Sequence, residues 1–122
     1  MSDKPRFDLE DRTYLFAKRV GQFVKRLPLT VTNAQYVKQV VRSSGSIAAN
    51  YIEANEAVSK DDFLYRIKIS RKESKESKLW LRLVETAGNG DLEKEQALLT
   101  KEAEELMLIF SAIMRKSQSS TS

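Results

Sequence analysis

The side chains with the clearest chemical potential are six basic residues that recur at helical spacing between residues 68 and 82. Residues three and four apart share a helix face, so this set would form one stripe. Such a stripe can follow the phosphates of a nucleic acid. Alternatively, the cations pair with carboxylates, such as Lys72 with Glu76, or only solvate the helix. The pattern predicts contact with RNA or DNA through Lys68, Arg71, Lys72, Lys75, Lys78 and Arg82.

A second basic set lies in the first helical segment, opposite its apolar stripe. The chain has 21 Lys and Arg residues against 17 Asp and Glu residues, which gives a formal net charge of +4. An excess of positive charge favours an anionic partner. The predicted nucleic-acid contact therefore also includes Lys18, Arg19, Lys25 and Arg26.

Other kinds of chemistry have little support in the residue types. The chain contains no Cys and no His, which excludes thiolate chemistry and the commonest acid–base group and metal ligand near neutral pH. Carboxylate metal sites in bundles use Glu-x-x-His pairs, and phosphate loops use Gly-Lys-Ser/Thr. Neither pattern is present. We therefore expect a protein that is not an enzyme, with no catalytic residue, no metal and no cofactor.

Four amphipathic segments must position these side chains. In the first, an apolar stripe runs from Leu9 to Leu27 and ends at Pro28, because proline disfavours the helical conformation before it. Apolar residues at spacings of three and four continue over about 32–57 and 60–87 and again from Leu92. Thr32, Ser59 and Asp91 are the predicted caps. Short connections then predict an all-α, antiparallel up-down-up-down four-helix bundle.

The bundle is expected to fill residues 9–116, between a flexible tail at 1–8 and a disordered tail at 117–122. The first residues precede no apolar run, as a signal peptide would require. No stretch approaches the roughly 20 apolar residues of a membrane span. We therefore expect a cytoplasmic protein without membrane contact.

Small residues interrupt the second and third segments. Residues 43–46 are Ser-Ser-Gly-Ser, which are poor helix formers. The core seam of the third segment also contains Ser70, Ser74 and Ser77. Two helices with small residues at their contact can approach closely, so we expect these two stretches to face each other.

The third segment carries a second apolar set, roughly opposite the seam. A helix of a monomeric bundle needs only one apolar face. The second set therefore predicts a subunit interface through Tyr65, Ile69, Trp80 and Leu83. Alternatively, Trp80 covers the edge of the core within one chain.

Two polar residues lie at the border of the second segment's apolar face. Asn50 and Glu53 are expected to be structural anchors that tie this helix to a neighbour, with Arg42 or Arg71 as the candidate partner. Alternatively, they form an exposed flank.

Residues 39–54, QVVRSSGSIAANYIEA, resemble the bacterial four-helix-bundle proteins encoded in intervening sequences of large-subunit ribosomal RNA genes. Accessory variability proteins of diversity-generating retroelements belong to the same broad group. The likeness continues through Asp62-Phe63-Leu64, Arg71-Lys72-Glu73 and Leu79-Trp80-Leu81-Arg82-Leu83.

The resemblance implies a four-helix bundle that assembles into a homopentamer with a basic surface. For retroelement members it implies binding to nucleic acid and to a reverse transcriptase, whereas the role of ribosomal members is open. Three functions follow as hypotheses. They are a nucleic-acid-binding oligomer, a protein–protein adaptor such as a reverse-transcriptase accessory protein, and an orphan structural bundle.

Overall fold

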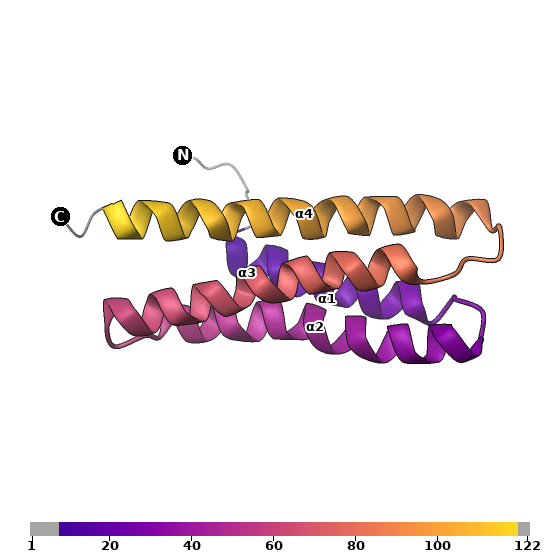
Figure 1. Ribbon diagram of the computed structural model, residues 1–122, viewed down its shortest axis with the longest axis horizontal. Helices are drawn as coiled ribbons and strands as arrows, with labels where there is room; N and C mark the ends of the chain where they lie inside the picture. Colours follow the sequence, from indigo (N-terminus) through magenta and orange to yellow (C-terminus); the bar gives the residue numbers. More distant parts are fainter. Residues whose placement is uncertain (1–7, 120–122) are drawn as a thin grey trace.

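The computed structural model describes residues 8–119, and over that range the fold is four helices with no strand. They are α1 (Leu9–Val24), α2 (Val31–Asn55), α3 (Lys60–Leu83) and α4 (Gly90–Ser119). Helices α1 and α3 each pack against both α2 and α4, and the long axes run side by side (Figure 1). The all-α prediction is confirmed, and the packing is consistent with an up-down bundle. The predicted tails lie outside the described residues, except for Asp8 and for residues 117–119, which continue α4.

Each helix begins at a polar cap, and two of these caps differ from prediction. Ser59 caps α3 as expected, because its hydroxyl accepts from the Asp62 N–H at 3.0 Å. Thr30 rather than Thr32 caps α2, accepting from the Asn33 N–H at 3.0 Å. Asn89 rather than Asp91 accepts from the N–H of Leu92 at the start of α4. In both cases a second polar residue stands two positions away, and the sequence pattern alone does not choose between them.

Helix α3 ends four residues before the predicted boundary. Val84 already has an extended backbone, with ψ of 147°. Ala87 and Gly88 have φ of 54° and 73°, a left-handed conformation that interrupts a helix. The connection from α3 to α4 therefore begins at Val84, four residues before Gly88.

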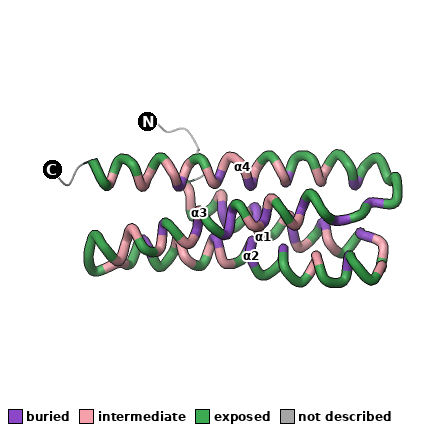
Figure 2. Tube along the Cα trace, in the orientation of Figure 1, coloured by how far each residue is buried: buried purple, intermediate pink, exposed green. Residues whose placement is uncertain are grey.

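The core runs the length of the bundle, with buried positions on the inward sides of the helices (Figure 2). Where α2 meets α3, serines replace large apolar residues. The Ser43 and Ser77 hydroxyl oxygens lie 2.7 Å apart, and the Ser70 hydroxyl donates to the Ile47 carbonyl at 3.0 Å. These serines are buried, which confirms that the two small-residue stretches face each other.

Ion pairs join α1 to α4 on the side away from α3. The Arg12 guanidinium donates to Glu102 at 2.7 Å and to Glu105 at 2.8 Å. The hydrogen bond to Glu102, together with the charges of both carboxylates, raises the pKa of Arg12 above its ordinary value. Arginine is already protonated in the unfolded chain at any ordinary pH. This shift therefore adds no pH dependence to stability between acidic and mildly alkaline conditions.

Candidate nucleic-acid interface

The outward side of α3 presents a continuous set of exposed residues, here called the outer α3 surface. These positions fall within one arc of the helix, because each follows another by three, four or seven residues. Three lysines form its centre, and a shallow depression of about 700 Å³ lies beside them. The outer α3 surface consists of Tyr65, Lys68, Lys72, Lys75, Leu79, Arg82 and Leu83, all exposed.

Two acidic residues of α3, Glu73 and Glu76, are held by a cation of α2, although Glu76 also lines the depression beside the lysines. Arg42 of α2 lies 3.3 Å from a carboxylate oxygen of Glu73 and 3.4 Å from one of Glu76. Glu73 is only 6% exposed, so Arg42 compensates a carboxylate that burial would otherwise penalise. Within residues 8–119, no carboxylate lies within ion-pair distance of Lys72. The alternative pairing of Lys72 with Glu76 is therefore not formed.

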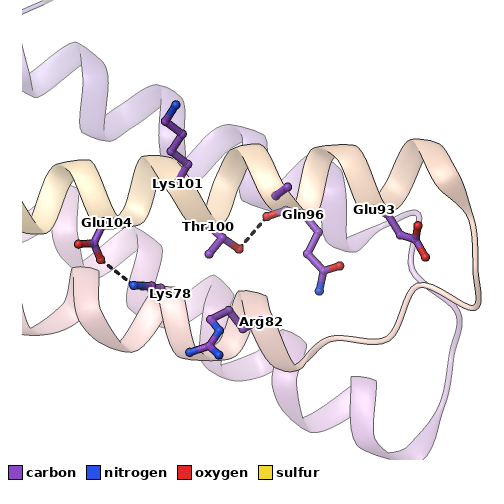
Figure 3. Close-up of a pocket in the computed structure, with 8 residues that line it drawn as sticks. Lys78, Arg82, Glu93, Gln96, Thr100, Lys101 and Glu104 are labelled. Atoms are coloured by element: carbon purple, nitrogen blue, oxygen red, sulfur yellow. Dashed lines mark hydrogen bonds and ion pairs between the residues drawn. The ribbon is translucent and has the colours of Figure 1, made fainter.

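Lys78 and Arg82 differ from the central lysines because they reach toward α4. The Lys78 ammonium pairs with Glu104 at 2.7 Å (Figure 3). Both basic residues line a groove of about 550 Å³ between α3 and α4. Gln96, in the same groove, donates to the carbonyls of Leu81 and Val84 at 2.8 and 3.0 Å. Lys78 is thus part of the α3–α4 contact, whereas Arg82 is exposed at its edge.

The basic residues of the first segment do not join this surface. Helix α1 packs against α2 and α4 and makes no contact with α3. Arg19 pairs with Glu95 at 3.3 Å, and the Lys18 ammonium lies 5.9 Å from the centre of the Tyr14 ring. Lys25 and Arg26 are exposed in the turn after α1. The two predicted basic sets therefore lie on different sides of the bundle.

Arg71, half-buried beside Lys72, is the sixth residue of the α3 set.

The four residues predicted to form a subunit interface are divided by the structure. Trp80 is half-buried and packs against the core. Its ring stacks on Tyr36 of α2, with centroids 6.2 Å apart. Ile69 is half-buried, and only Tyr65 and Leu83 are exposed. The position of Trp80 agrees with the alternative explanation, in which it covers the edge of the core within one chain.

Asn50 links two helices, although through a different partner from those expected. Its side-chain oxygen accepts from Arg66 of α3 at 3.1 Å, and its amide nitrogen donates to the Ser46 carbonyl at 3.0 Å. Arg42 is occupied by Glu73 and Glu76 instead. Glu53 is exposed, and no side-chain bond to another residue of 8–119 is found for it, so it belongs to the flank.

Asn33 is a structural residue that the sequence pattern did not indicate. It is 1% exposed. Its amide donates to the Pro28 and Glu85 carbonyls at 3.0 and 2.9 Å and accepts from the Glu85 N–H at 2.9 Å. It therefore ties the α1–α2 connection to the α3–α4 connection. In the sequence, Asn33 is marked only by its place next to the predicted cap, Thr32. That place does not indicate a bond to a residue as distant in sequence as Glu85.

The described residues show no arrangement typical of a metal site or a membrane segment. Between residues 8 and 119, no three acidic side chains come together as metal ligands would. None of the helices in this range has the length and apolar character needed to cross a membrane.

Comparison with known proteins gives a family and a structural relative. No curated protein matches the sequence. The fold is similar to the crystal structure of a protein of unknown function from the S23 ribosomal protein family of Bacteroides thetaiotaomicron, with a TM-score of 0.72 and 28% sequence identity. The similarity covers 88% of this chain and 98% of that one. The family of 23S rRNA-intervening sequence proteins matches residues 7–112. The chain belongs to the 23S rRNA-intervening sequence protein family.

Proposed function

We propose that the protein is a non-enzymatic, up-down-up-down four-helix bundle that binds RNA or DNA through the outer α3 surface and works as a homo-oligomer. The observation that carries this proposal is the free state of the central lysines. Lys68, Lys72 and Lys75 are exposed, and no ion pair occupies them within the described chain. Their charge is therefore available to phosphates.

The ion pairs of Arg42 explain why these charges are not neutralised. A solvated helix face commonly alternates cations and carboxylates three or four residues apart. Here Arg42 of α2 holds both Glu73 and Glu76, although Glu76 also lines the depression beside the lysines. By the helical rise, Lys68 and Lys75 are about 10 Å apart along the axis, with Lys72 between them. Three positive charges over this length form a local site of high potential.

The test is salt-dependent binding of a labelled nucleic acid, measured by fluorescence anisotropy. Each neutralised phosphate contributes about −0.7 to −0.9 to the slope of log affinity against log salt. The variant Lys68→Gln/Lys72→Gln/Lys75→Gln should lose roughly two units of slope and bind at least tenfold more weakly at low salt. The matched control is Lys38→Gln/Lys94→Gln/Lys101→Gln, because these three lysines are also exposed. It removes the same charge and should keep most of the slope.

Two results would remove this proposal. One is the absence of binding at low salt to mixed single-stranded and duplex probes. The other is an equal loss of slope in the two triple variants, since that would reflect net charge alone. A stoichiometric protein partner that persists after nuclease treatment, together with no nucleic-acid binding, would favour the adaptor hypothesis.

Self-association is a second proposal, and a different surface favours it. One side of α1 and one side of α2 form a surface of small and apolar residues, exposed except for half-buried Gly21. It is here called the α1–α2 surface and consists of Tyr14, Gly21, Val41, Gly45 and Ile52. Val41 is 46% exposed and Ile52 is 48% exposed. A side chain added at Gly21 or Gly45 would meet no atom within 4 Å. The bond from Asn55 to Glu10, at 2.8 Å, places these sides of the two helices next to each other.

An exposed apolar surface with small residues at its centre suits a second helix at close range. We propose that another copy of this chain covers the α1–α2 surface, in the homopentamer that the family resemblance implies. This assignment leaves the outer α3 surface uncovered, and the assembly would present several copies of it to one nucleic acid.

A further inference from the structure

Tyr65 places an aromatic ring within the basic part of the outer α3 surface. Tyr65 is 59% exposed, so much of this residue is open to solvent. Tyr65 lines the same depression as the three central lysines, together with Ile69, Arg71 and Glu76. The helical rise puts Tyr65 about 4.5 Å from Lys68 and about 10.5 Å from Lys72 along the axis. An aromatic ring and cationic groups therefore face solvent side by side.

The Tyr65 ring has a support from its own helix. The Arg66 guanidinium carbon lies 5.6 Å from the ring centroid, a distance typical of a cation–π contact. Arg66 is itself held by the Asn50 side-chain oxygen at 3.1 Å. This chain of contacts connects the exposed ring to α2. The ring is therefore partly preorganised, which lowers the entropy cost of placing another group on it.

We propose that the outer α3 surface binds single-stranded nucleic acid in preference to duplex, with one base stacked on Tyr65 and the adjacent lysines on phosphates. This inference rests on the proposed nucleic-acid-binding function and deepens it. Proteins that bind single strands combine a positively charged track with aromatic rings that stack on bases. The outer α3 surface has both features within about two helical turns.

A duplex cannot use the ring in this way. Its bases are stacked on one another, and only their edges are accessible in the grooves. A duplex would therefore gain the lysine contacts but no stacking on Tyr65. Stacking on an aromatic ring does not select among bases, because every base has a π-face. The one carboxylate that lines the depression, Glu76, is paired with Arg42 at 3.4 Å. Binding should therefore tolerate many base sequences.

The experiment compares single-stranded and duplex probes of identical length and sequence, as both DNA and RNA, by fluorescence anisotropy at one fixed salt concentration. The wild-type protein should bind the single strands at least tenfold more tightly than the duplexes. Tyr65→Ala should weaken single-strand binding at least fivefold, the lower end of the measured range for removing one stacking ring. It should leave duplex binding unchanged. DNA and RNA strands should bind alike, because neither contact uses the 2′-hydroxyl.

Two further variants separate stacking from apolar area. Tyr65→Phe keeps the ring and should bind single strands within twofold of the wild type, whereas Tyr65→Leu should behave like Tyr65→Ala. Leu98→Ala removes an exposed apolar residue from α4 and serves as the matched control, with no expected change. Light scattering should give every variant the mass of the wild-type assembly.

Several outcomes overturn the inference while the proposed function stands. They are duplex binding equal to single-strand binding, unchanged single-strand binding by Tyr65→Ala, and binding to RNA strands alone. A change of assembly mass in Tyr65→Ala would also overturn it, because the ring would then belong to a subunit interface. Absence of binding to all four probes at low salt would instead remove the proposed function itself.

Discussion

At the scale of single residues, the side-chain amides of buried Asn33 and half-buried Gln96 hold the end of the bundle at which α3 stops. Asn33 makes three hydrogen bonds to backbone groups of Pro28 and Glu85. Gln96 donates to the carbonyl of Leu81 in the last turn of α3 and to that of Val84, which follows the helix. Carbonyl groups at a helix end need such partners, because no intrahelical N–H remains for them. The two amides therefore let α3 stop abruptly before the connection to α4.

Replacing Asn33 with Ala should lower the free energy of unfolding by roughly 1–3 kcal/mol, because it leaves buried backbone groups without partners. Urea unfolding followed by circular dichroism would measure the change. Asn55→Ala is the matched control, since Asn55 is exposed and makes one surface bond to Glu10. That variant should stay within about 0.5 kcal/mol of the wild type. Equal losses in both variants would contradict the anchoring role of Asn33.

At the scale of the elements, the contact between α2 and α3 depends on small side chains. Ser43 and Ser77 fill the space that large apolar residues occupy elsewhere in the core, and they satisfy each other at 2.7 Å. The Ser74 hydroxyl donates to the Ser70 carbonyl at 2.8 Å. These serine hydroxyls are buried but have partners, so they do not carry the cost of unpaired polar groups.

Replacing one of these serines with a larger residue should lower the free energy of unfolding more than removing its hydroxyl does. Ser77→Ala should cost about 0.5–1.5 kcal/mol, the net value of one hydrogen bond. Ser77→Leu should cost roughly 1–3 kcal/mol or more, because it forces the helices apart. Lys75→Leu, at an exposed position of the same helix, is the control and should change stability little. A Ser77→Leu variant as stable as Ser77→Ala would contradict this prediction, because the α2–α3 contact would then accommodate a larger side chain.

The helices and this contact could be predicted from sequence because local periodicity determines them. Apolar spacing located all four helices, and the serines of 43–46 and 70–77 met as expected. Partners distant in sequence could not be predicted in the same way. From sequence, Glu76 could pair with Lys72 on its own helix or with Arg42 on α2. In the structure, the packing of α2 against α3 brings Arg42 to Glu76. The same packing gives Trp80 a neighbour in Tyr36.

At the scale of the whole molecule, the outer α3 surface and the α1–α2 surface lie on different sides of the bundle. Helices α1 and α3 lie at opposite corners, since each contacts α2 and α4 and neither contacts the other. The outer α3 surface is basic and without carboxylate partners in the described chain, whereas the cations Arg12 and Arg19 of α1 pair with carboxylates of α4. The exposed apolar residues of the α1–α2 surface lie away from the outer α3 surface. One side can thus bind a partner copy while the other binds an anion.

Gly45→Leu tests this division directly. Gly45 is exposed, and a side chain there meets no atom within 4 Å in the single chain. Leucine is also a better helix former than glycine by up to about 1 kcal/mol. The variant should therefore keep the far-ultraviolet helix signal of the wild type. In the proposed assembly, however, the added side chain would hold the partner copy away from α2. Light scattering at micromolar concentration should show a smaller mass than the wild type.

The control for this variant is Ala112→Leu, which adds a similar side chain at an exposed position of α4 and should leave the mass unchanged. Val41→Glu provides an independent test, because a carboxylate on the α1–α2 surface would lose its solvation when a second copy covers it. It should dissociate the assembly while the far-ultraviolet helix signal persists. If both Gly45→Leu and Val41→Glu keep the wild-type mass, another surface joins the subunits. If the wild type is itself a monomer, self-association is removed, and the outer α3 surface must act as a single copy.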